Sequence, residues 1–280
     1  SSRTPQTWQL MARPLRVVAG KTEPPWKLVL WIRHGHSEHN AALETAFASG
    51  SARRSFVGAP DPPLSGTGRA QAEALGSRLR PAGVELVASS PLRRAFETAR
   101  SAFPQAPLCL LEALRERHFG QPSERRSCRS EIAAALAGGA GPAADLEGLE
   151  GQADPMPPTG GPEPQAAARA RLARALRWLL GRRERRVAVV SHGWLLGQGL
   201  LPLLRIEGLE ASKLAVTPRS RDFGYCEARA YAMRWGESRG GAPGAQPQAL
   251  ARPLTLEEVL LADSAPKWLG LPPTIGPAVM

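Results

Sequence analysis

The sequence has few cysteines and no long apolar run. Its three cysteines, Cys109, Cys128 and Cys226, lie far apart and form no C-x-x-C pair. This pattern gives neither a metal-binding spacing nor a disulfide framework, and it is typical of a reducing compartment. The most apolar stretches, Val187–Val190 and Leu195–Leu204, are much shorter than a membrane-spanning helix requires or are interrupted by Gly and Pro. We therefore expect a soluble protein without a membrane span.

Acidic residues are scarce relative to basic ones. The chain has 36 Lys and Arg against 25 Asp and Glu, which gives a formal net charge of +11. Such a charge attracts anions, among them nucleic acid, acidic lipid, an acidic partner or a phosphorylated substrate. The arginines are scattered in pairs, and only 5% of the residues are aromatic. A nucleic-acid surface of interleaved basic and stacking residues is therefore not favoured.

The first 25 residues contain no acid before Glu23, although they include Arg3, Arg13, Arg16 and Lys21. Residues 1–25 are therefore predicted to form a basic N-terminal arm, which resembles the end of a transit sequence or a mature terminus. This favours an organellar matrix or stroma, of a mitochondrion or a plastid, and otherwise the cytoplasm.

Short apolar strands alternate with helical segments over residues 26–235, which we predict to be one domain. Strands are expected at 27–33, 84–89, 107–111, 186–191 and within 223–235, and helices at 40–49, 65–80, 91–103, 165–180 and 193–204. Ser90 precedes Pro91 as the expected N-cap of one helix. Residues 138–164 are rich in Ala, Gly and Pro, and predict an irregular surface insert. The fold class is therefore α/β, with a mostly parallel sheet flanked by helices, an insert and terminal extensions.

Two histidines directly follow predicted strands. His34 comes after the strand at 27–33, and His192 comes after the strand at 186–191. In parallel α/β sheets, functional sites lie beyond the carboxyl ends of the strands, so we expect these histidines to meet. A phosphate ester needs fixed positive charges, which Arg supplies with planar paired donors. Neutral imidazole can accept the phosphoryl group, and a carboxylic acid can protonate the leaving oxygen.

Five ordered blocks carry a family resemblance. Arg33-His34-Gly35 with Ser37 and Asn40 is similar to the signature R-H-G-x-S-x-x-N of the histidine phosphatase (phosphoglycerate mutase-like) superfamily. The other four blocks resemble further conserved stretches of the superfamily and are found at Asp61–Leu79, Ser89–Ala99, Leu114–Gly120 and Val189–Gly193. Together these blocks cover roughly Lys27–Gly199.

The resemblance implies a role for six residues. His34 would be the nucleophile and Glu116 the general acid, while Arg33, Asn40, Arg94 and protonated His192 would hold the phosphate. It implies no metal and no cofactor. Four neighbours have no matched role and are left out of the predicted site, namely Arg93, His36, His39 and His118.

A finer likeness joins Arg115–Glu131 and Phe223–Ala230 to the plant and fungal phosphoglycerate mutase-like branch of the superfamily. Tyr225 stands where that branch often has Asn, and the Ala/Gly/Pro insert replaces a region that shapes the substrate pocket. The function implied is hydrolysis of a small phosphorylated metabolite through a phosphohistidine. Two alternatives stay open, a phosphoglycerate mutase-type phosphoryl transfer and a structural subunit of a large organellar complex.

Residues 236–280 are expected to form a C-terminal extension. The segment is Gly-rich and polar at first, and apolar residues follow from Leu254, with a short helix predicted near 254–262. Such a segment is typical of a docking element for a protein partner, with the basic arm adding electrostatic steering. A helix folded back onto the domain is an equal alternative. In the docking interpretation, deletion of 236–280 leaves phosphatase activity largely intact but weakens association with a protein partner.

Overall fold

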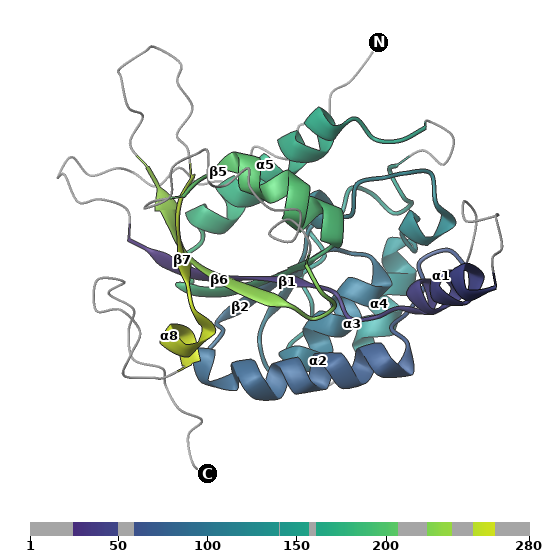
Figure 1. Ribbon diagram of the computed structural model, residues 1–280, viewed down its shortest axis with the longest axis horizontal. Coiled ribbons are helices and arrows are strands. Elements are labelled where there is room, and N and C mark those ends of the chain that lie inside the picture. The colour runs from purple at the N-terminus through teal and green to yellow at the C-terminus, as the bar shows by residue number, and fades with distance from the viewer. Residues whose placement is uncertain are drawn as a thin grey trace.

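The computed structural model describes residues 25–49, 59–139, 141–156, 161–206, 223–236 and 249–260. In these ranges the strands form one sheet of seven, in the order β3-β2-β4-β1-β6-β7-β5 (Figure 1). The strands are β1 (Lys27–Arg33), β2 (Leu86–Ser89), β3 (Leu108–Leu110), β4 (Arg186–Ser191), β5 (Leu204–Ile206), β6 (Ala228–Trp235) and β7 (Ala249–Leu254). Among the described strands only β6 runs antiparallel to its neighbours, which confirms the predicted mostly parallel α/β sheet.

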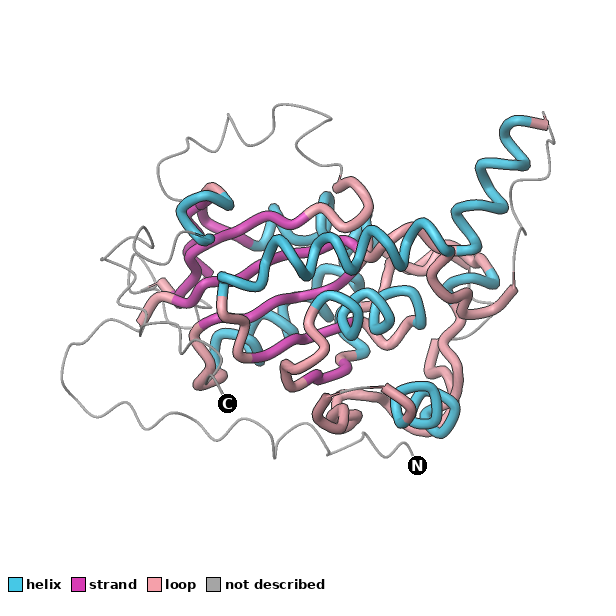
Figure 2. Tube along the Cα trace, turned by 90° about the horizontal axis from the view of Figure 1, so that it is seen from below, coloured by secondary structure: helices cyan, strands magenta, loops and turns pink. Residues whose placement is uncertain are grey.

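Helices cover both faces of the sheet. The helices are α1 (Glu38–Ala48), α2 (Gly66–Leu79), α3 (Arg93–Ala102), α4 (Arg129–Ala137), α5 (Gln165–Gly181) and α8 (Leu256–Leu260), with a π-helical turn at Leu195–Leu200. Figure 1 shows α5 on one face and α2, α3 and α4 on the other, and in Figure 2 the strands run side by side beneath the helices that cross them.

The sequence of β1 explains why helices must cover both faces of the sheet. Val29 and Trp31 pack into the core beneath α5, whereas Leu28, Leu30 and Ile32 pack into the core beneath α2 and α3. All five side chains are almost fully buried. A strand that is apolar at every position is typical of a central strand in a parallel sheet, because both of its faces are covered.

The predicted boundary at residue 235 falls within the sheet. β7 pairs with β6 from Ala230↔Leu254 to Trp235↔Ala249, and β5 pairs with β7 in turn. Val259 of α8 is buried against the core that contains α2. Residues 249–260 therefore belong to the domain, as in the folded-back alternative, and this part of the predicted extension is corrected. The arm at 1–24 and the segments 237–248 and 261–280 lie outside the described residues.

Deletion of everything after residue 236 is accordingly expected to destabilise the domain, in contrast to the prediction from sequence. It removes β7 and α8, including the buried side chains of Leu250 and Val259. Each such side chain stabilises the fold by about 1.5–3 kcal/mol. A chain that ends at residue 260 keeps both elements and is the control. Thermal unfolding of the two chains tests this, and equal midpoints would contradict the placement of β7.

The N-terminus of α3 differs from the prediction. The N-cap is Leu92 rather than Ser90, and the Asp61 carboxylate accepts the Arg93 backbone N–H at 2.7 Å. The Ser90 hydroxyl accepts the Leu92 backbone N–H at 3.3 Å and also contacts Nε2 of His192 at 2.8 Å. A long-range contact from Asp61 thus satisfies the first N–H of the helix, and the serine before it reaches His192.

The Ala/Gly/Pro insert is attached to the domain more firmly than a surface excursion would be. In the described part, Leu149 is buried and Asp154 binds the fully buried guanidinium of Arg115 through both carboxylate oxygens. Asp154 also accepts the Arg126 backbone N–H at 2.8 Å. The insert thereby contributes a buried ion pair next to Glu116.

No helix among the described residues is long and apolar enough to cross a membrane.

Candidate active site

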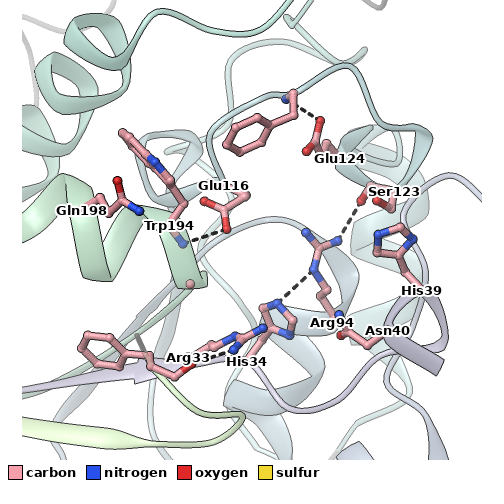
Figure 3. Close-up of a pocket in the computed structure, with 13 residues that line it drawn as sticks. Arg33, His34, His39, Asn40, Arg94, Glu116, Ser123, Glu124, Trp194 and Gln198 are labelled. Carbon is pink, nitrogen blue, oxygen red and sulfur yellow. Dashed lines mark hydrogen bonds between the residues drawn. The ribbon is translucent and has the colours of Figure 1, made fainter. Parts of the chain in front are cut away.

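The two predicted histidines meet at the carboxyl ends of adjacent parallel strands. Arg33 of β1 is the register partner of Ser191 of β4, so His34 and His192 leave the sheet side by side. Their ring centroids are 5.0 Å apart. In front of His34 lies a cavity of about 410 Å³ (Figure 3), whose lining includes five of the six predicted residues, Arg33, His34, Asn40, Arg94 and Glu116.

Two glycines bring the His34 loop against α2. A side chain at Gly68 would place its Cβ 1.9 Å from the carbonyl oxygen of His36, and one at Gly35 would lie 2.8 Å from the carbonyl oxygen of Gly68. The backbone of Gly35 does not adopt the left-handed region. The signature glycine is thus required here for close approach of the chain rather than for a left-handed backbone conformation.

The hydrogen bonds of His34 define which nitrogen can react. Nδ1 lies 2.7 Å from the carbonyl oxygen of Gly35, and a carbonyl can only accept, so Nδ1 carries the proton. Nε2 therefore has the lone pair, and it accepts a hydrogen bond from Nε of Arg94 at 3.3 Å. Burial, followed by the charges of Arg94 and Arg33, holds the pKa of His34 well below its ordinary value. The ring is neutral at physiological pH.

Two guanidinium groups and one amide lie beside this imidazole. Arg94 also donates to the carbonyl oxygen of Ser123 at 2.7 Å, and burial lowers its pKa while nearby Glu116 opposes that shift. Arg33 donates to the carbonyl oxygen of Phe223 at 2.6 Å. The side-chain oxygen of Asn40 accepts from Ser37, so its NH₂ group is the part that can donate to a ligand. These donors match the oxygens of a phosphate.

Glu116 lies across the cavity from His34 (Figure 3). Its side chain faces the start of the helical segment that contains Trp194. Its carboxylate accepts the backbone N–H groups of Trp194 at 3.2 Å and Leu195 at 3.1 Å. Burial nevertheless raises the pKa of Glu116 above its ordinary value, because the cost of removing the charge from water outweighs these bonds. A carboxyl group with a raised pKa is suited to proton donation near neutral pH.

Buried arginines hold the Glu116 segment in place. Arg171 of α5 donates to the carbonyl oxygens of Ala113, Arg115 and Glu116, at 2.9, 2.6 and 2.9 Å. Arg115 forms ion pairs with Glu112 and Asp154, and it donates to the carbonyl oxygen of Glu124, the residue after Ser123. The acid and the Ser123 carbonyl that binds Arg94 are therefore fixed by one network.

His192 is the sixth predicted residue and lies apart from the cavity lining. It is fully buried and lies beside His34 without lining the cavity. Burial, followed by the charges of Arg94 and His34, also lowers its pKa well below the ordinary value. His192 is therefore a neutral imidazole in the ligand-free site, and its protonation around a bound phosphate stays a prediction.

A model of the histidine phosphatase superfamily (branch 1) matches residues 29–221, which is most of the chain. The chain belongs to this superfamily. The match does not distinguish the plant and fungal branch, so that finer likeness stays a prediction.

Solved structures of phosphatases and hydrolases resemble the chain at low identity. Mycobacterial hydrolase 1 is 21% identical, with 82% of this chain and 97% of that chain covered and a TM-score of 0.50, and it shows the fold. Mycobacterial glucosyl-3-phosphoglycerate phosphatase bound to VO₃ is 22% identical, and the match covers 75% of this chain and 92% of that chain with a TM-score of 0.47. Phosphoserine phosphatase of Entamoeba histolytica bound to 3-phosphoglyceric acid is 19% identical, and the match covers 84% of this chain and 99% of that chain with a TM-score of 0.44. No curated protein matches the chain.

Several residues of this histidine phosphatase site were not predicted from sequence. His39, which was left out, lines the cavity together with Glu124 and Trp194. Tyr225 stacks on the Arg33 guanidinium, with 4.1 Å from the carbon to the ring centre. The one sign of this contact in the sequence is that Tyr225 stands where the plant and fungal branch often has Asn. The described residues contain no group of three or more His, Cys, Asp or Glu placed to hold a metal ion.

The adjacent residues Arg93 and Arg94 provide a matched pair for testing the site. Arg94 contacts His34, whereas Arg93 is half exposed and pairs with Glu97 on the helix surface at 2.7 Å. Arg94→Ala is expected to reduce turnover by 10²–10³-fold, or about 3 kcal/mol, because one preorganised donor to the transferring group is lost. Arg93→Ala is the control and should reduce it little. Steady-state kinetics with one phosphomonoester measures both, and equal losses would contradict the assignment of Arg94.

Proposed function

We propose that the chain is a phosphomonoester hydrolase that works through a phosphohistidine at Nε2 of His34. The observation that carries this proposal is the fixed tautomer of His34. Its neutral ring directs a lone pair toward Arg94, and a carboxyl group with a raised pKa faces the same cavity. Such an arrangement supplies a nucleophile, positive charge for the phosphoryl oxygens and a proton donor for the leaving oxygen.

In the first step, Nε2 of His34 attacks phosphorus and the bond from phosphorus to the ester oxygen breaks. Glu116 transfers its proton to the departing oxygen, so the product leaves as a neutral alcohol. Arg33, Arg94 and the amide of Asn40 bind the phosphoryl oxygens. The charge of the transferring group is then balanced by side chains, which supports the proposal that no metal ion is needed.

In the second step, water attacks the phosphohistidine and the Nε2–P bond breaks. Glu116, now a carboxylate, takes a proton from the water, and inorganic phosphate is released. Neutral His192 lies behind His34, where its contact with the Ser90 hydroxyl supports a role in holding the nucleophile in place. A bound phosphate dianion would offset the charges that lower the pKa of His192.

A panel of phosphomonoesters assayed with EDTA present tests the proposal. We expect release of inorganic phosphate, and a chromatographic analysis of phosphoglycerate products distinguishes hydrolysis from mutase transfer. Rapid quenching into alkali, where phosphohistidine is stable, followed by mass spectrometry should locate the phosphate on His34. Activity that disappears with EDTA and returns with a metal ion would contradict the metal-independent mechanism.

A further inference from the structure

One aromatic side chain of the active-site cavity lining is also exposed to solvent. Among the described residues, two large hydrophobic side chains are exposed, Phe47 at 58% and Phe119 at 41%. Phe119 lines the cavity, whereas Phe47 lies on α1 and does not. Exposed apolar surface within a concave site commonly marks the position of an apolar part of a ligand.

Phe119 and Trp194 are both tied to groups of the site. Phe119 donates its backbone N–H to Glu124 at 2.7 Å, and Trp194 donates its backbone N–H to Glu116. Figure 3 shows Trp194 and Gln198 on the side of the cavity where Glu116 lies, away from Asn40 and His39. Trp194 is thus hydrogen-bonded to the proposed proton donor, and Phe119, three residues after Glu116 in the chain, lines the same cavity.

Arg117 holds both rings in place. Its guanidinium carbon lies 4.7 Å from the centre of the Phe119 ring and 5.0 Å from that of Trp194. The same guanidinium donates to the carbonyl oxygen of Glu163 at 2.7 Å, which fixes its position. Stacking of a cation on two aromatic rings is favourable and orients them, so this wall is preorganised before a ligand binds.

We propose that Phe119 and Trp194 form a leaving-group subsite for phosphomonoesters of apolar or aromatic alcohols. This proposal rests on the proposed function, since Glu116 must lie next to the ester oxygen that it protonates. Whatever is attached to that oxygen then lies against the two rings beside Glu116. An apolar or aromatic group removes their surface from water, whereas a small polar group leaves them solvated.

Two alkyl phosphates isolate the contribution of this subsite. Propyl phosphate and 3-phenylpropyl phosphate release alkoxides of similar basicity and differ by one phenyl ring. We expect kcat/KM to be about tenfold or more higher for the phenyl compound, chiefly through a lower KM. Phe119→Ala should reduce this ratio toward one and Phe119→Leu should give an intermediate ratio. Phe47→Ala, the control with a similarly exposed ring outside the cavity, should leave it unchanged.

The same comparison can be made without turnover. Butylphosphonate and 4-phenylbutylphosphonate cannot be hydrolysed, and calorimetric titration of the full chain compares their affinities. A preference for the phenyl compound that Phe119→Ala removes supports the subsite even if neither ester is hydrolysed, in which case the proposed function alone fails. Equal kcat/KM values for the two esters, equal affinities for the two phosphonates, or a preference that survives Phe119→Ala would overturn the subsite.

Discussion

Replacement of His34 by alanine is expected to abolish both turnover and phosphohistidine formation. His34 combines an unprotonated Nε2, a neutral ring and an adjacent guanidinium that donates to that Nε2. Removal of a covalent nucleophile eliminates the reaction path instead of weakening one contact, so we expect turnover to fall by more than about 10⁴-fold. The measurement is steady-state phosphate release together with labelling by a ³²P-phosphomonoester under alkaline quench.

A neighbouring histidine distinguishes loss of the nucleophile from loss of the fold. His36 follows closely in sequence but does not line the cavity, and its ring contacts the Ser65 hydroxyl at 2.8 Å. His36→Ala should therefore still be labelled, and circular dichroism should show that both variants are folded. Label that persists in His34→Ala would place the phosphoryl group on another residue.

The sequence predicted the centre of the site because local patterns determine it. β1 and β4 are short apolar runs, and each is followed directly by a histidine, so the parallel sheet alone brings His34 and His192 together. The motif-based assignments of Arg94 and Glu116 agree with their positions in the cavity. Arg93, which has no role in the predicted site, lies on the helix surface although it is adjacent to Arg94.

The parts that sequence missed depend on contacts between distant segments. The ion pair of Arg115 with Asp154 joins residues 39 positions apart, and Asp154 lies in an insert whose composition predicts no packing. The strand β7 contains Arg252 and Pro253 and gives a weak apolar pattern, so its pairing with β6 could not be read locally. The protonation of His192 depends on burial and on neighbouring charges, which only the folded structure supplies.

Replacement of Glu116 by glutamine should separate substrates by their leaving groups. An alkoxide leaves poorly without a proton, so hydrolysis of propyl phosphate should slow by about 10²–10⁴-fold in Glu116→Gln. The phenolate of p-nitrophenyl phosphate leaves unaided, so the first step with this substrate should change little. Rapid-quench measurement of the first turnover compares the two substrates at the same step.

The pH dependence provides a second readout of the same residue. Because burial raises the pKa of Glu116, its acid form persists to higher pH than that of an ordinary glutamic acid. The kcat/KM of the wild-type chain for propyl phosphate should therefore fall as the pH rises through this raised pKa, and Glu116→Gln should lack that decline. If the variant instead slows both substrates equally, Glu116 is structural. Glu124 would then be the candidate acid, since it lines the cavity, whereas Glu112 is held by Arg115 and Arg126 in buried ion pairs.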